Sequence, residues 1–305
     1  MRLDEDKELF NSWIIQTGKR FNILEEYVEK DYWLVFLLKK MFAKHPSYVF
    51  KGGTSLSKCY HLINRFSEDI DISYPVPFDE IITADKKRKI KGVTQSVKEL
   101  GLEISNKDNI RCLKYFNQLI VTYPSLFSDN KIEKSIVVEL AAQIPSFPYN
   151  KLSIQSFIGE YLKTIGRDDL VTLYELEPFE VNVQALSRTV VDKTFAICDY
   201  YLSNKTNKHS RHLYDLYKIS TVLSYDENLI ALFKQVREYR RTLKVCLSAK
   251  EGIILSDVLD KIIKDDFFKE DYQKTTFFLL YDQINYQTCL KTLIKLQSFL
   301  KQHDL

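Results

Sequence analysis

Glycine, proline and cysteine are scarce in this sequence, and each scarcity argues against a class of protein. The 305 residues include eight glycines, seven prolines and five cysteines. No segment is of low complexity, and no linker rich in glycine, proline or serine divides the chain. The cysteines form no C-x-x-C pair and have no histidine at zinc-ligand spacing, which argues against a disulfide framework and a structural zinc site. We therefore expect a protein of a reducing cytoplasm.

Long hydrophobic runs and a strong charge imbalance are also missing. No stretch approaches the roughly 18 uninterrupted apolar residues of a membrane-spanning helix, and the N-terminus is acidic where a signal peptide would be basic. We expect no membrane partner. The formal net charge of +3 is too small to identify a nucleic-acid-binding protein, although basic residues gather at 86–91, 204–212 and 237–244. Each stretch is either a solvated surface or part of a surface for a polyanion.

Hydrophobic residues make up 45% of the chain, which is enough for one large or two ordinary globular domains. Helical and strand-like patterns alternate up to about residue 185, and only helical periodicity follows. The sequence thus predicts an α+β fold, with a mixed sheet flanked by helices in a domain 1–185 and a helical bundle in a domain 186–305. The expected helices are 3–17, 22–44, 54–62, 78–100, 187–203, 210–224, 226–246, 253–263, 267–283 and 287–302. The expected strands are 48–50, 69–74, 102–106, 111–123, 132–143 and 179–183.

Two adjacent glycines follow the first expected strand, in the sequence KGGTS at 51–55. Gly52 and Gly53 allow positive φ and the close approach of another backbone or a phosphate, because no Cβ intervenes. Thr54 and Ser55 are placed to cap the next helix and to offer hydroxyl and N–H groups to an anion. The spacing is not that of a Walker loop, and a tight strand-to-helix turn alone also explains the glycines.

Three carboxylates stand on expected strands. Asp69 and Asp71 share a strand face about 6 to 7 Å apart, where they repel each other unless water or a cation lies between them. Glu139 interrupts an apolar run typical of a strand covered on both faces, where an unpaired charge is costly. As alternatives, the aspartates lie on the solvent-exposed face of an amphipathic edge strand, and Glu139 forms a salt bridge with Lys134 or Arg111.

Convergence of these carboxylates would provide a site for one or two Mg²⁺ ions bound to a nucleoside triphosphate. Such ions bridge the phosphates and activate an attacking hydroxyl in an in-line displacement. This is the chemistry of nucleotidyl transfer.

The segment KGGTSLSKCYHLINRFSEDIDIS at 51–73 resembles the G-[GS] … D-x-D signature of the polymerase-beta-type nucleotidyltransferase superfamily. In detail it is similar to the AbiEii/MenT group of bacterial toxin and abortive-infection nucleotidyltransferases. The resemblance covers about residues 20–220, and Gly53 stands where other superfamily members carry serine. Four further stretches agree with the group: VEKDYWLVFLL at 28–38, IVVELAA at 136–142, VVDKTFAI at 190–197 and RHLYDLYKI at 211–219.

The resemblance implies catalytic roles for five residues. Asp69, Asp71 and Glu139 are expected to bind Mg²⁺, and Lys193 is expected to contact the triphosphate. Asp215 is expected to be required for activity. From the sequence alone, Lys193 also fits a surface position on an amphipathic helix. A buried Asp215 would need a basic partner, such as Lys193 or Arg211.

The same resemblance implies a nucleotide-binding role for the glycine turn and for two residues ahead of the D-x-D. Arg65 and Ser67 either orient the acids or touch phosphate, or only support the acids through hydrogen bonds. The expected nucleotide-binding residues are Lys51, Gly52, Gly53, Thr54, Ser55, Arg65 and Ser67.

The expected function is Mg²⁺-dependent transfer of NMP from an NTP to RNA, in particular to the 3′ end of tRNA. Such an enzyme resembles the toxin of a toxin–antitoxin or abortive-infection pair, so a cognate antitoxin is implied. One alternative is transfer to a small molecule or a protein side chain. A second is a non-catalytic module that binds nucleotide or RNA.

Overall fold

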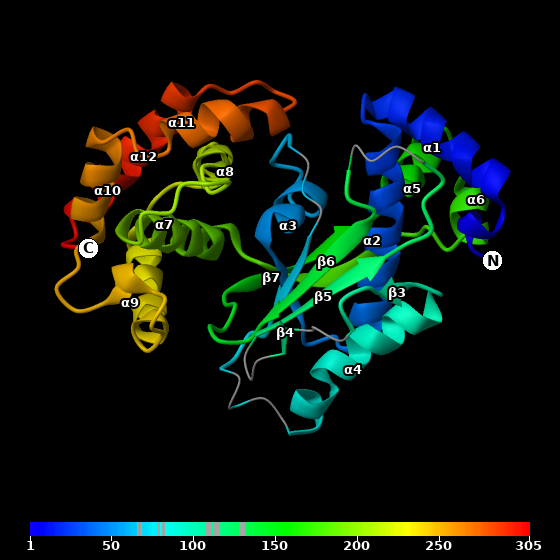
Figure 1. Ribbon diagram of the computed structural model, residues 1–305, viewed down its shortest axis with the longest axis horizontal. Helices are drawn as coiled ribbons and strands as arrows, with labels where there is room; N and C mark the ends of the chain where they lie inside the picture. Colours follow the sequence, from blue (N-terminus) through cyan, green and yellow to red (C-terminus); the bar gives the residue numbers. More distant parts are fainter. Residues whose placement is uncertain are drawn as a thin grey trace. The chain divides into compact units, whose positions relative to one another are not determined.

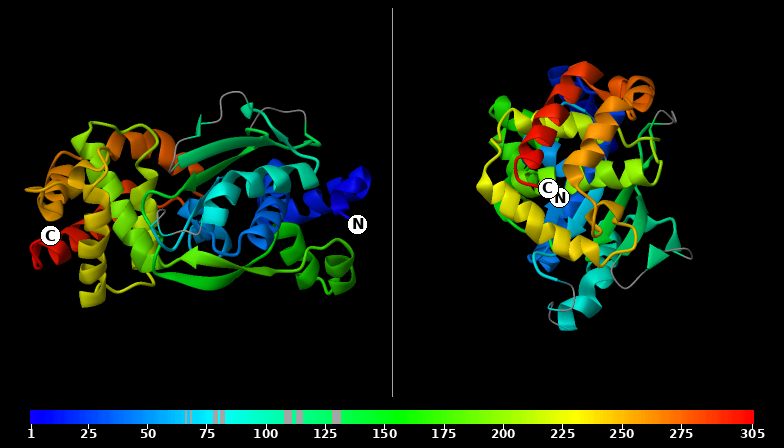
Figure 2. Two further views of the ribbon diagram at one scale, coloured as in Figure 1. Left: turned by 90° about the horizontal axis from the view of Figure 1, so that it is seen from below. Right: turned by 90° about the vertical axis from the view of Figure 1, so that its left-hand side faces the viewer.

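The computed structural model divides the chain into two compact units (Figures 1 and 2). The first unit comprises Met1–Cys59 and Ser67–Val183, and the second comprises Tyr60–Phe66 and Gln184–Leu305. A short segment from the first half of the chain therefore belongs to the second unit. The structure describes residues 1–65, 67, 69–77, 80, 83–107, 111–112, 116–127 and 132–305, without the side chains of 83–90 and 111–112.

An eight-stranded mixed sheet runs through the first unit. The strand order is β3-β5-β6-β2-β1-β8-β7, and β4 pairs with β5. Strand β2 is parallel to β6, and β1 is parallel to β8, whereas the pairs β1–β2 and β5–β6 are antiparallel. The strands are β1 (Val49–Lys51), β2 (Ile70–Ser73), β3 (Glu103–Ile104), β4 (Arg111–Cys112), β5 (Phe116–Thr122), β6 (Ser135–Ala141), β7 (Tyr149–Ile154) and β8 (Phe179–Gln184).

Strand β6 has one buried and one partly exposed face. Ile136, Val138 and Leu140 are at most 1% exposed, whereas Val137 and Glu139 are partly exposed. Alternate residues of a strand point to opposite faces, so the near-continuous apolar run does not place every side chain in the core. The expectation that this strand is covered on both faces is therefore wrong.

The helices of the first unit pack around α2, which contacts β6, α1, α4 and α5. Trp33 of α2 stacks on Tyr123, with the ring centroids 6.2 Å apart. Both rings are buried and extend the core from the helix to the end of β5. The helices are α1 (Lys7–Phe21), α2 (Glu25–Lys44), α3 (Gly52–Lys58), α4 (Thr83–Glu99), α5 (Phe157–Thr164) and α6 (Asp168–Leu173).

Helix α2 also buries three consecutive charged residues. Glu29 accepts the backbone N–H of Leu126 over 2.6 Å, and Lys30 donates to a backbone carbonyl over 2.9 Å. The carboxylate of Asp31 lies 2.8 Å from Nζ of Lys58, at the end of α3. These bonds hold neighbouring segments and α3 against α2, which gives the charged part of the VEKDYW stretch a structural role.

The second unit is helical. Helix α12 contacts both α10 and α8, and α10 and α12 lie side by side in both figures. The helices are α7 (Leu186–Leu202), α8 (Arg211–Ser220), α9 (Glu227–Arg241), α10 (Leu255–Lys264), α11 (Lys269–Asp271) and α12 (Tyr286–Lys301).

The segment 267–283 is not the single helix that its periodicity predicts. A π-helical turn over Tyr272–Thr276 and a 3₁₀ turn over Phe277–Leu279 follow α11 instead. Leu280 then adopts an extended conformation and forms a β-bridge with Arg65. This pairing with a segment distant in sequence ends the helix, because an extended residue cannot continue the i to i−4 hydrogen bonds.

The mixed sheet and the many helices agree with the expected α+β class. Strand β7 and helices α5 and α6 were not expected. Most side chains of β7 are exposed, so the strand lacks the alternation that reveals a half-buried strand. The succession of a nucleotidyltransferase sheet domain 1–185 and a bundle domain 186–305 stays a prediction. Among the described helices, none combines the length and the apolar character needed to span a bilayer.

Candidate active site

One row of polar side chains crosses the sheet of the first unit. Asp71 on β2 is the register partner of Glu139 on parallel β6 and of Lys51 on antiparallel β1. Gln118 on β5 is in turn the partner of Glu139. Register partners on adjacent strands, which lie about 4.8 Å apart, carry their side chains on the same face. The sheet therefore presents these four partly exposed residues next to one another.

The two aspartates of the D-x-D, Asp69 and Asp71, are held in position by different parts of the structure. Asp71 lies within β2, between Ile70 and Ile72, which are fully buried on the opposite face. Asp69 lies one residue before the strand and is partly exposed. The pleat alone therefore keeps Asp71 on the polar face, while Asp69 is positioned by the segment that leads into the strand.

Glu139 accepts a hydrogen bond from an amide of the neighbouring strand. Nε2 of Gln118 donates a hydrogen bond to Oε1 of Glu139 over 2.8 Å. Lys134, one of the two expected ion-pair partners, donates to the carbonyl of Phe127. The side chain of Arg111, the other expected partner, lies outside the described residues. A neutral donor leaves the full negative charge on Glu139, so the carboxylate still suits a cation.

The glycine turn lies directly against Asp71. Gly52 has φ +78°, and a Cβ built on it would lie 2.0 Å from Oδ2 of Asp71. Gly52 thus serves two purposes, since its backbone conformation strains other residues and its missing side chain makes room for the carboxylate. The two glycines predict a close approach of a phosphate or a second backbone here. The structure shows that a side chain of the sheet makes that approach.

The hydroxyl groups after the glycines do not cap helix α3. The helix begins at Gly52, with Lys51 as an N-cap that makes no side-chain hydrogen bond. Oγ of Ser55 donates to the carbonyl of Gly52 over 2.9 Å, and Oγ1 of Thr54 donates to Oγ of Ser67 over 3.0 Å. The capping expectation is wrong because the helix starts two residues earlier than expected. The bond from Thr54 to Ser67 joins the turn to the segment that leads to Asp69.

The polar face of the sheet carries oxygen atoms of the type that binds divalent cations. Carboxylate oxygens are the ligands that Mg²⁺ prefers, and Asp71 and Glu139 lie in register on neighbouring strands. Within the ranges that the structure describes, however, no three histidine, cysteine, aspartate or glutamate side chains are grouped so that they could hold a metal ion. The assignment of Asp69, Asp71 and Glu139 as metal ligands is therefore a proposal.

A second polar cluster lies in the second unit, around Asp215 on α8. Oδ1 and Oδ2 of Asp215 accept bonds from Nε and Nη2 of Arg65 over 2.9 and 2.8 Å, and Nζ of Lys193 on α7 lies 2.6 Å from Oδ2. Asp215 is fully buried, and the side chains of Arg65 and Lys193 are at most 8% exposed. Asp215 thus pairs with Lys193, as expected, and with Arg65 rather than with Arg211.

The charges of this cluster compensate one another. Burial opposes ionisation of Asp215, but Arg65 and Lys193 outweigh it and hold the pKa of its carboxyl well below the usual range. Burial lowers the pKa of the Lys193 ammonium, and the negative charge of Asp215 opposes that shift. Lys193 is therefore a buried, oriented lysine and not the surface lysine of an amphipathic helix.

His212, which is not among the site residues expected from the sequence, belongs to the same cluster. Its Nδ1 lies 3.3 Å from Nζ of Lys193. Burial, followed by the charge of Lys193, lowers the pKa of the imidazole well below its usual value, so the ring is neutral. Tyr200 stacks on His212 and on His209, with centroid distances of 5.8 and 3.6 Å. The available signal was the three-residue spacing from His212 to Asp215, which places both on one helix face.

The basic stretch at 237–244 is only partly a surface. Arg240 is 9% exposed, and its guanidinium lies 3.1 Å from Asp192 and 3.5 Å from Asp199. Arg241, next in sequence, has a half-exposed side chain that contacts Glu238. The basic residues at 237–244 therefore contribute less positive charge to the surface than the sequence indicates, because the side chain of Arg240 is buried among the helices.

A family model described as nucleotidyl transferase AbiEii toxin, type IV toxin–antitoxin system, matches residues 37–293. The crystal structure of JHP933 from Helicobacter pylori resembles the chain with a TM-score of 0.48 and 18% identity, over 92% of each chain. A second structure from H. pylori, described as a candidate nucleotidyltransferase, gives a TM-score of 0.48 and 17% identity over 92% of this chain and 95% of that one. No curated protein sequence matches the chain. Since the family model spans most of its length, the chain belongs to the AbiEii family of nucleotidyltransferase toxins of type IV toxin–antitoxin systems.

Proposed function

We propose that this nucleotidyltransferase moves NMP from an NTP to an RNA hydroxyl, with Mg²⁺, and that the acceptor is the 3′ end of a tRNA. The observation that carries the proposal is the register of Asp71 with Glu139 beside the glycine turn, in a chain of the AbiEii family. The family implies an NTP substrate and a cognate antitoxin. A role in abortive infection and the tRNA acceptor are parts of the proposal.

Asp71 and Glu139 are proposed to hold the metal, with Asp69 as the third ligand. A bound Mg²⁺ would neutralise phosphate charge and lower the pKa of the attacking hydroxyl. Gln118 positions Glu139 through its 2.8 Å hydrogen bond. Gly52 keeps space for the carboxylate of Asp71, which any other residue at this position would displace.

The glycine turn is proposed to bind the phosphates of the nucleotide. A turn without side chains lets phosphate oxygens approach backbone N–H groups, and Gly53 lies beside Gly52 at the start of α3. Lys51, in register with Asp71, supplies positive charge on the same face of the sheet. Thr54 and Ser67 support this turn through their mutual hydrogen bond, and Ser55 supports it through the bond to its backbone.

Lys193 is proposed to bind the triphosphate and to stabilise the charge that develops on the leaving pyrophosphate. A lysine acts on phosphate as a compact point charge. Asp215 holds its ammonium at 2.6 Å, and Arg65 holds Asp215 through two further bonds. In this proposal Lys193 is the residue that touches substrate, whereas Asp215 and Arg65 position it.

Incorporation of labelled NTPs into RNA tests the proposal. Purified enzyme, total RNA and each of the four labelled NTPs are incubated with Mg²⁺ or with a chelator, and the labelled RNA species are identified. We expect label at tRNA 3′ ends, dependent on the metal. Asp71→Asn should reduce the rate by about a hundredfold or more, because metal-assisted stabilisation is worth several kcal/mol.

Glu103→Gln is the matched control, since it neutralises an exposed carboxylate on β3, an edge strand that is separated from β2 by β5 and β6. It should leave the rate unchanged. Label on a protein or a small molecule, with none on RNA, would refute the RNA acceptor. Equal rates for Asp71→Asn and the wild type would refute the assigned site.

A further inference from the structure

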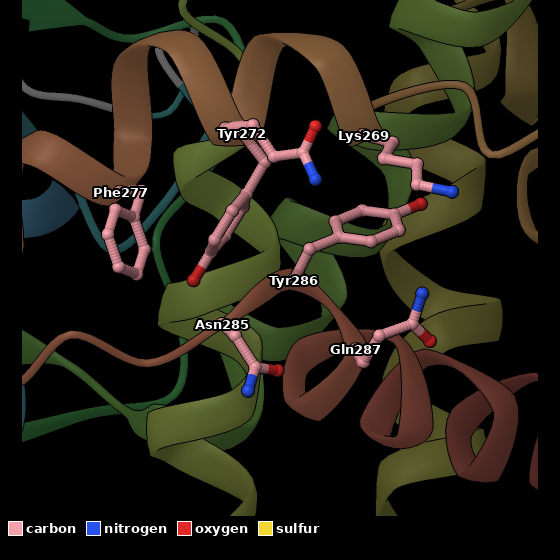
Figure 3. Close-up of a pocket in the computed structure, with 7 residues that line it drawn as sticks. Lys269, Tyr272, Phe277, Asn285, Tyr286 and Gln287 are labelled. Atoms are coloured by element: carbon pink, nitrogen blue, oxygen red, sulfur yellow. The ribbon is translucent and has the colours of Figure 1, made fainter.

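A pocket of about 360 Å³ lies in the second unit, at the irregular turn between α11 and α12 (Figure 3). The π-helical turn Tyr272–Thr276 and the first residues of α12 contribute its walls. The described residues that line it include none of those assigned to nucleotidyl transfer. The volume is within the usual range of small-molecule sites, roughly 300 to 1,000 Å³.

Aromatic rings form the apolar part of the pocket. Tyr272 and Tyr286 are 0% and 4% exposed, and their rings meet edge to face with centroids 5.7 Å apart. The hydroxyl of Tyr272 donates to the carbonyl of Ile284 over 2.8 Å, which fixes its ring. Figure 3 shows Phe277 beside Tyr272, so three flat side chains line one pocket. The two tyrosines are almost fully buried, so the partly exposed Phe277 is the ring of the three that can stack on a planar ligand.

Carboxamide groups provide the polar part. Asn285 is the N-cap of α12, and its Oδ1 accepts the backbone N–H of Thr288 over 2.9 Å. Its Nδ2 is not used by this cap. The exposed side chains of Gln273 and Gln287 line the same pocket. A carboxamide donates and accepts hydrogen bonds in one plane, which matches the edge of a nucleobase.

One basic side chain, Lys269, lines the pocket, and the described lining residues include no aspartate or glutamate. Its partner Asp266, outside the lining, balances its charge until the pair opens. The ammonium of Lys269 lies 2.7 Å from Asp266, and both side chains are about two fifths exposed, at 43% and 38%. An exposed ion pair of this kind contributes little, so Lys269 can turn to a phosphate at small cost. Burial and the charge of Asp266 raise the pKa of Tyr286, so its hydroxyl stays protonated beside that carboxylate.

We propose that this pocket binds one nucleobase of a single-stranded RNA acceptor, with Lys269 at the adjoining phosphate. The inference deepens the proposed function and rests on its RNA acceptor. Aromatic stacking, carboxamide hydrogen bonds and one positive charge together match a base with its phosphate, whereas an apolar ligand or an uncharged protein side chain would leave the lysine unused. Phe278 and Tyr281, 78% and 52% exposed, lie in the same turn and offer rings to neighbouring bases.

RNA affinity tests the pocket independently of catalysis. A short fluorescent single-stranded RNA is titrated with the full chain, with chelator and without NTP, and anisotropy is followed. Asn285→Asp keeps the helix cap, because Asp and Asn cap equally well, but replaces the Nδ2 donor by a negative oxygen. It should weaken binding about tenfold, the scale of losing one base contact.

Lys269→Gln tests the phosphate contact. It should weaken binding and reduce the dependence of log K on log salt by about 0.7, the slope of one phosphate contact on a single strand. Lys264→Gln is its control, because Lys264 forms a comparable exposed ion pair with Asp260 on the neighbouring α10. The control should leave affinity and slope unchanged. Unchanged affinity in both Asn285→Asp and Lys269→Gln overturns the proposal.

Photo-crosslinking locates the bound strand. RNA that contains 4-thiouridine should crosslink to the segment 269–287, and an excess of adenosine monophosphate should compete only weakly. Crosslinks solely elsewhere, or displacement by the mononucleotide at the concentration that suffices for RNA, overturn the assignment to an RNA strand. If the pocket variants lose RNA affinity but the wild type transfers no label to RNA, the proposed function fails and the pocket stands. If RNA is labelled and the variants keep the wild-type KM for RNA, the pocket fails and the function stands.

Discussion

Gly52 and Asp71 approach so closely that no side chain fits between them. A Cβ on Gly52 would lie 2.0 Å from Oδ2 of Asp71 and 2.9 Å from its Cγ. The backbone of Gly52 also has φ +78°, where a side chain is strained. The turn and the carboxylate therefore depend on each other: the glycine leaves the room that Asp71 occupies beside Glu139.

Gly52→Ala should abolish nucleotidyl transfer in a protein that still folds. Positive φ costs an alanine about 1 kcal/mol, and the new methyl group must push the carboxylate of Asp71 out of its position. Gly101→Ala provides a matched control, since Gly101 has φ +70° but nothing within 4 Å of an added Cβ. Denaturant unfolding should show a similar loss of stability from the backbone in both variants, and only Gly52→Ala should lose activity. Full activity in Gly52→Ala would contradict the close coupling of turn and carboxylate.

Asp215 should be essential for the stability of the second unit, and Lys193 should be essential for activity alone. Asp215→Asn removes the carboxylate that buried Lys193 contacts at 2.6 Å and that buried Arg65 binds through two hydrogen bonds, which should lower the free energy of unfolding by about 3 to 5 kcal/mol. Lys193→Met leaves Asp215 bound to Arg65 through two hydrogen bonds, so the chain should fold and yet be inactive. Urea unfolding and single-turnover rates separate the two effects.

Acid should remove the contribution of Asp215. Its pKa is lowered in the folded state, so its stabilisation is complete above the pKa of an unfolded aspartate, about 3.9, and is lost as the pH falls below that value. The stability difference between wild type and Asp215→Asn should therefore be constant near neutral pH and should shrink below about pH 4. Asp169→Asn, at the exposed pair with Arg167, should not change stability. If the stability difference between the wild type and Asp215→Asn stays the same in acid, the ion pairs of Asp215 are not its source.

His212 should make the second unit less stable in mild acid. Its pKa is lowered in the folded state, so the unfolded chain binds the proton more readily below about pH 6.5. Stability should therefore fall as the pH drops from 7 to 5, by at most about 1.4 kcal/mol per pH unit for this one group. His212→Gln keeps an acceptor for Lys193 and should flatten the dependence, as measured by thermal unfolding at each pH. An identical dependence in both proteins would show that other groups cause it.

Sequence patterns gave the strands of the site because the site is built on simple alternation. Asp71 lies between two buried isoleucines, and Glu139 lies between Val138 and Leu140, so alternation alone predicts a strand position for each acid. The sequence does not predict which strands pair with each other. The side-by-side position of Gln118 and Glu139 depends on the register of the antiparallel strands β5 and β6, and no local pattern encodes that register.

The ion-pair partners of buried charged residues are harder to predict from the sequence than the strands. Arg65 pairs with Asp215 across 150 residues, and this contact exists because the segment 60–66 belongs to the second unit. Periodicity describes which face of a helix is apolar, but it does not say which distant charge neutralises an acid on that face. The irregular turn after α11 was missed for a related reason: its end is set by the bridge from Leu280 to Arg65.

Arg240 and Arg241 are neighbours in sequence, and the same substitution at each compares a buried arginine with an exposed one. The guanidinium of Arg240 contacts Asp192 and Asp199, and its side chain is 11% exposed, whereas that of Arg241 is 49% exposed. Arg240→Glu would place three carboxylates together in a poorly hydrated site. We expect a loss of several kcal/mol in unfolding free energy, because an uncompensated buried charge costs about 3 to 5 kcal/mol.

Arg241→Glu changes the net charge of the chain by the same amount but leaves the packing intact, so thermal unfolding should be close to that of the wild type. If the surface of α9 contacts RNA, this variant alone should lower RNA affinity and its salt dependence without loss of stability. Anisotropy titrations and melting curves of the two variants distinguish the cases. Equal stability of Arg240→Glu and Arg241→Glu would show that the contacts of Arg240 with Asp192 and Asp199 do not stabilise the helices they join.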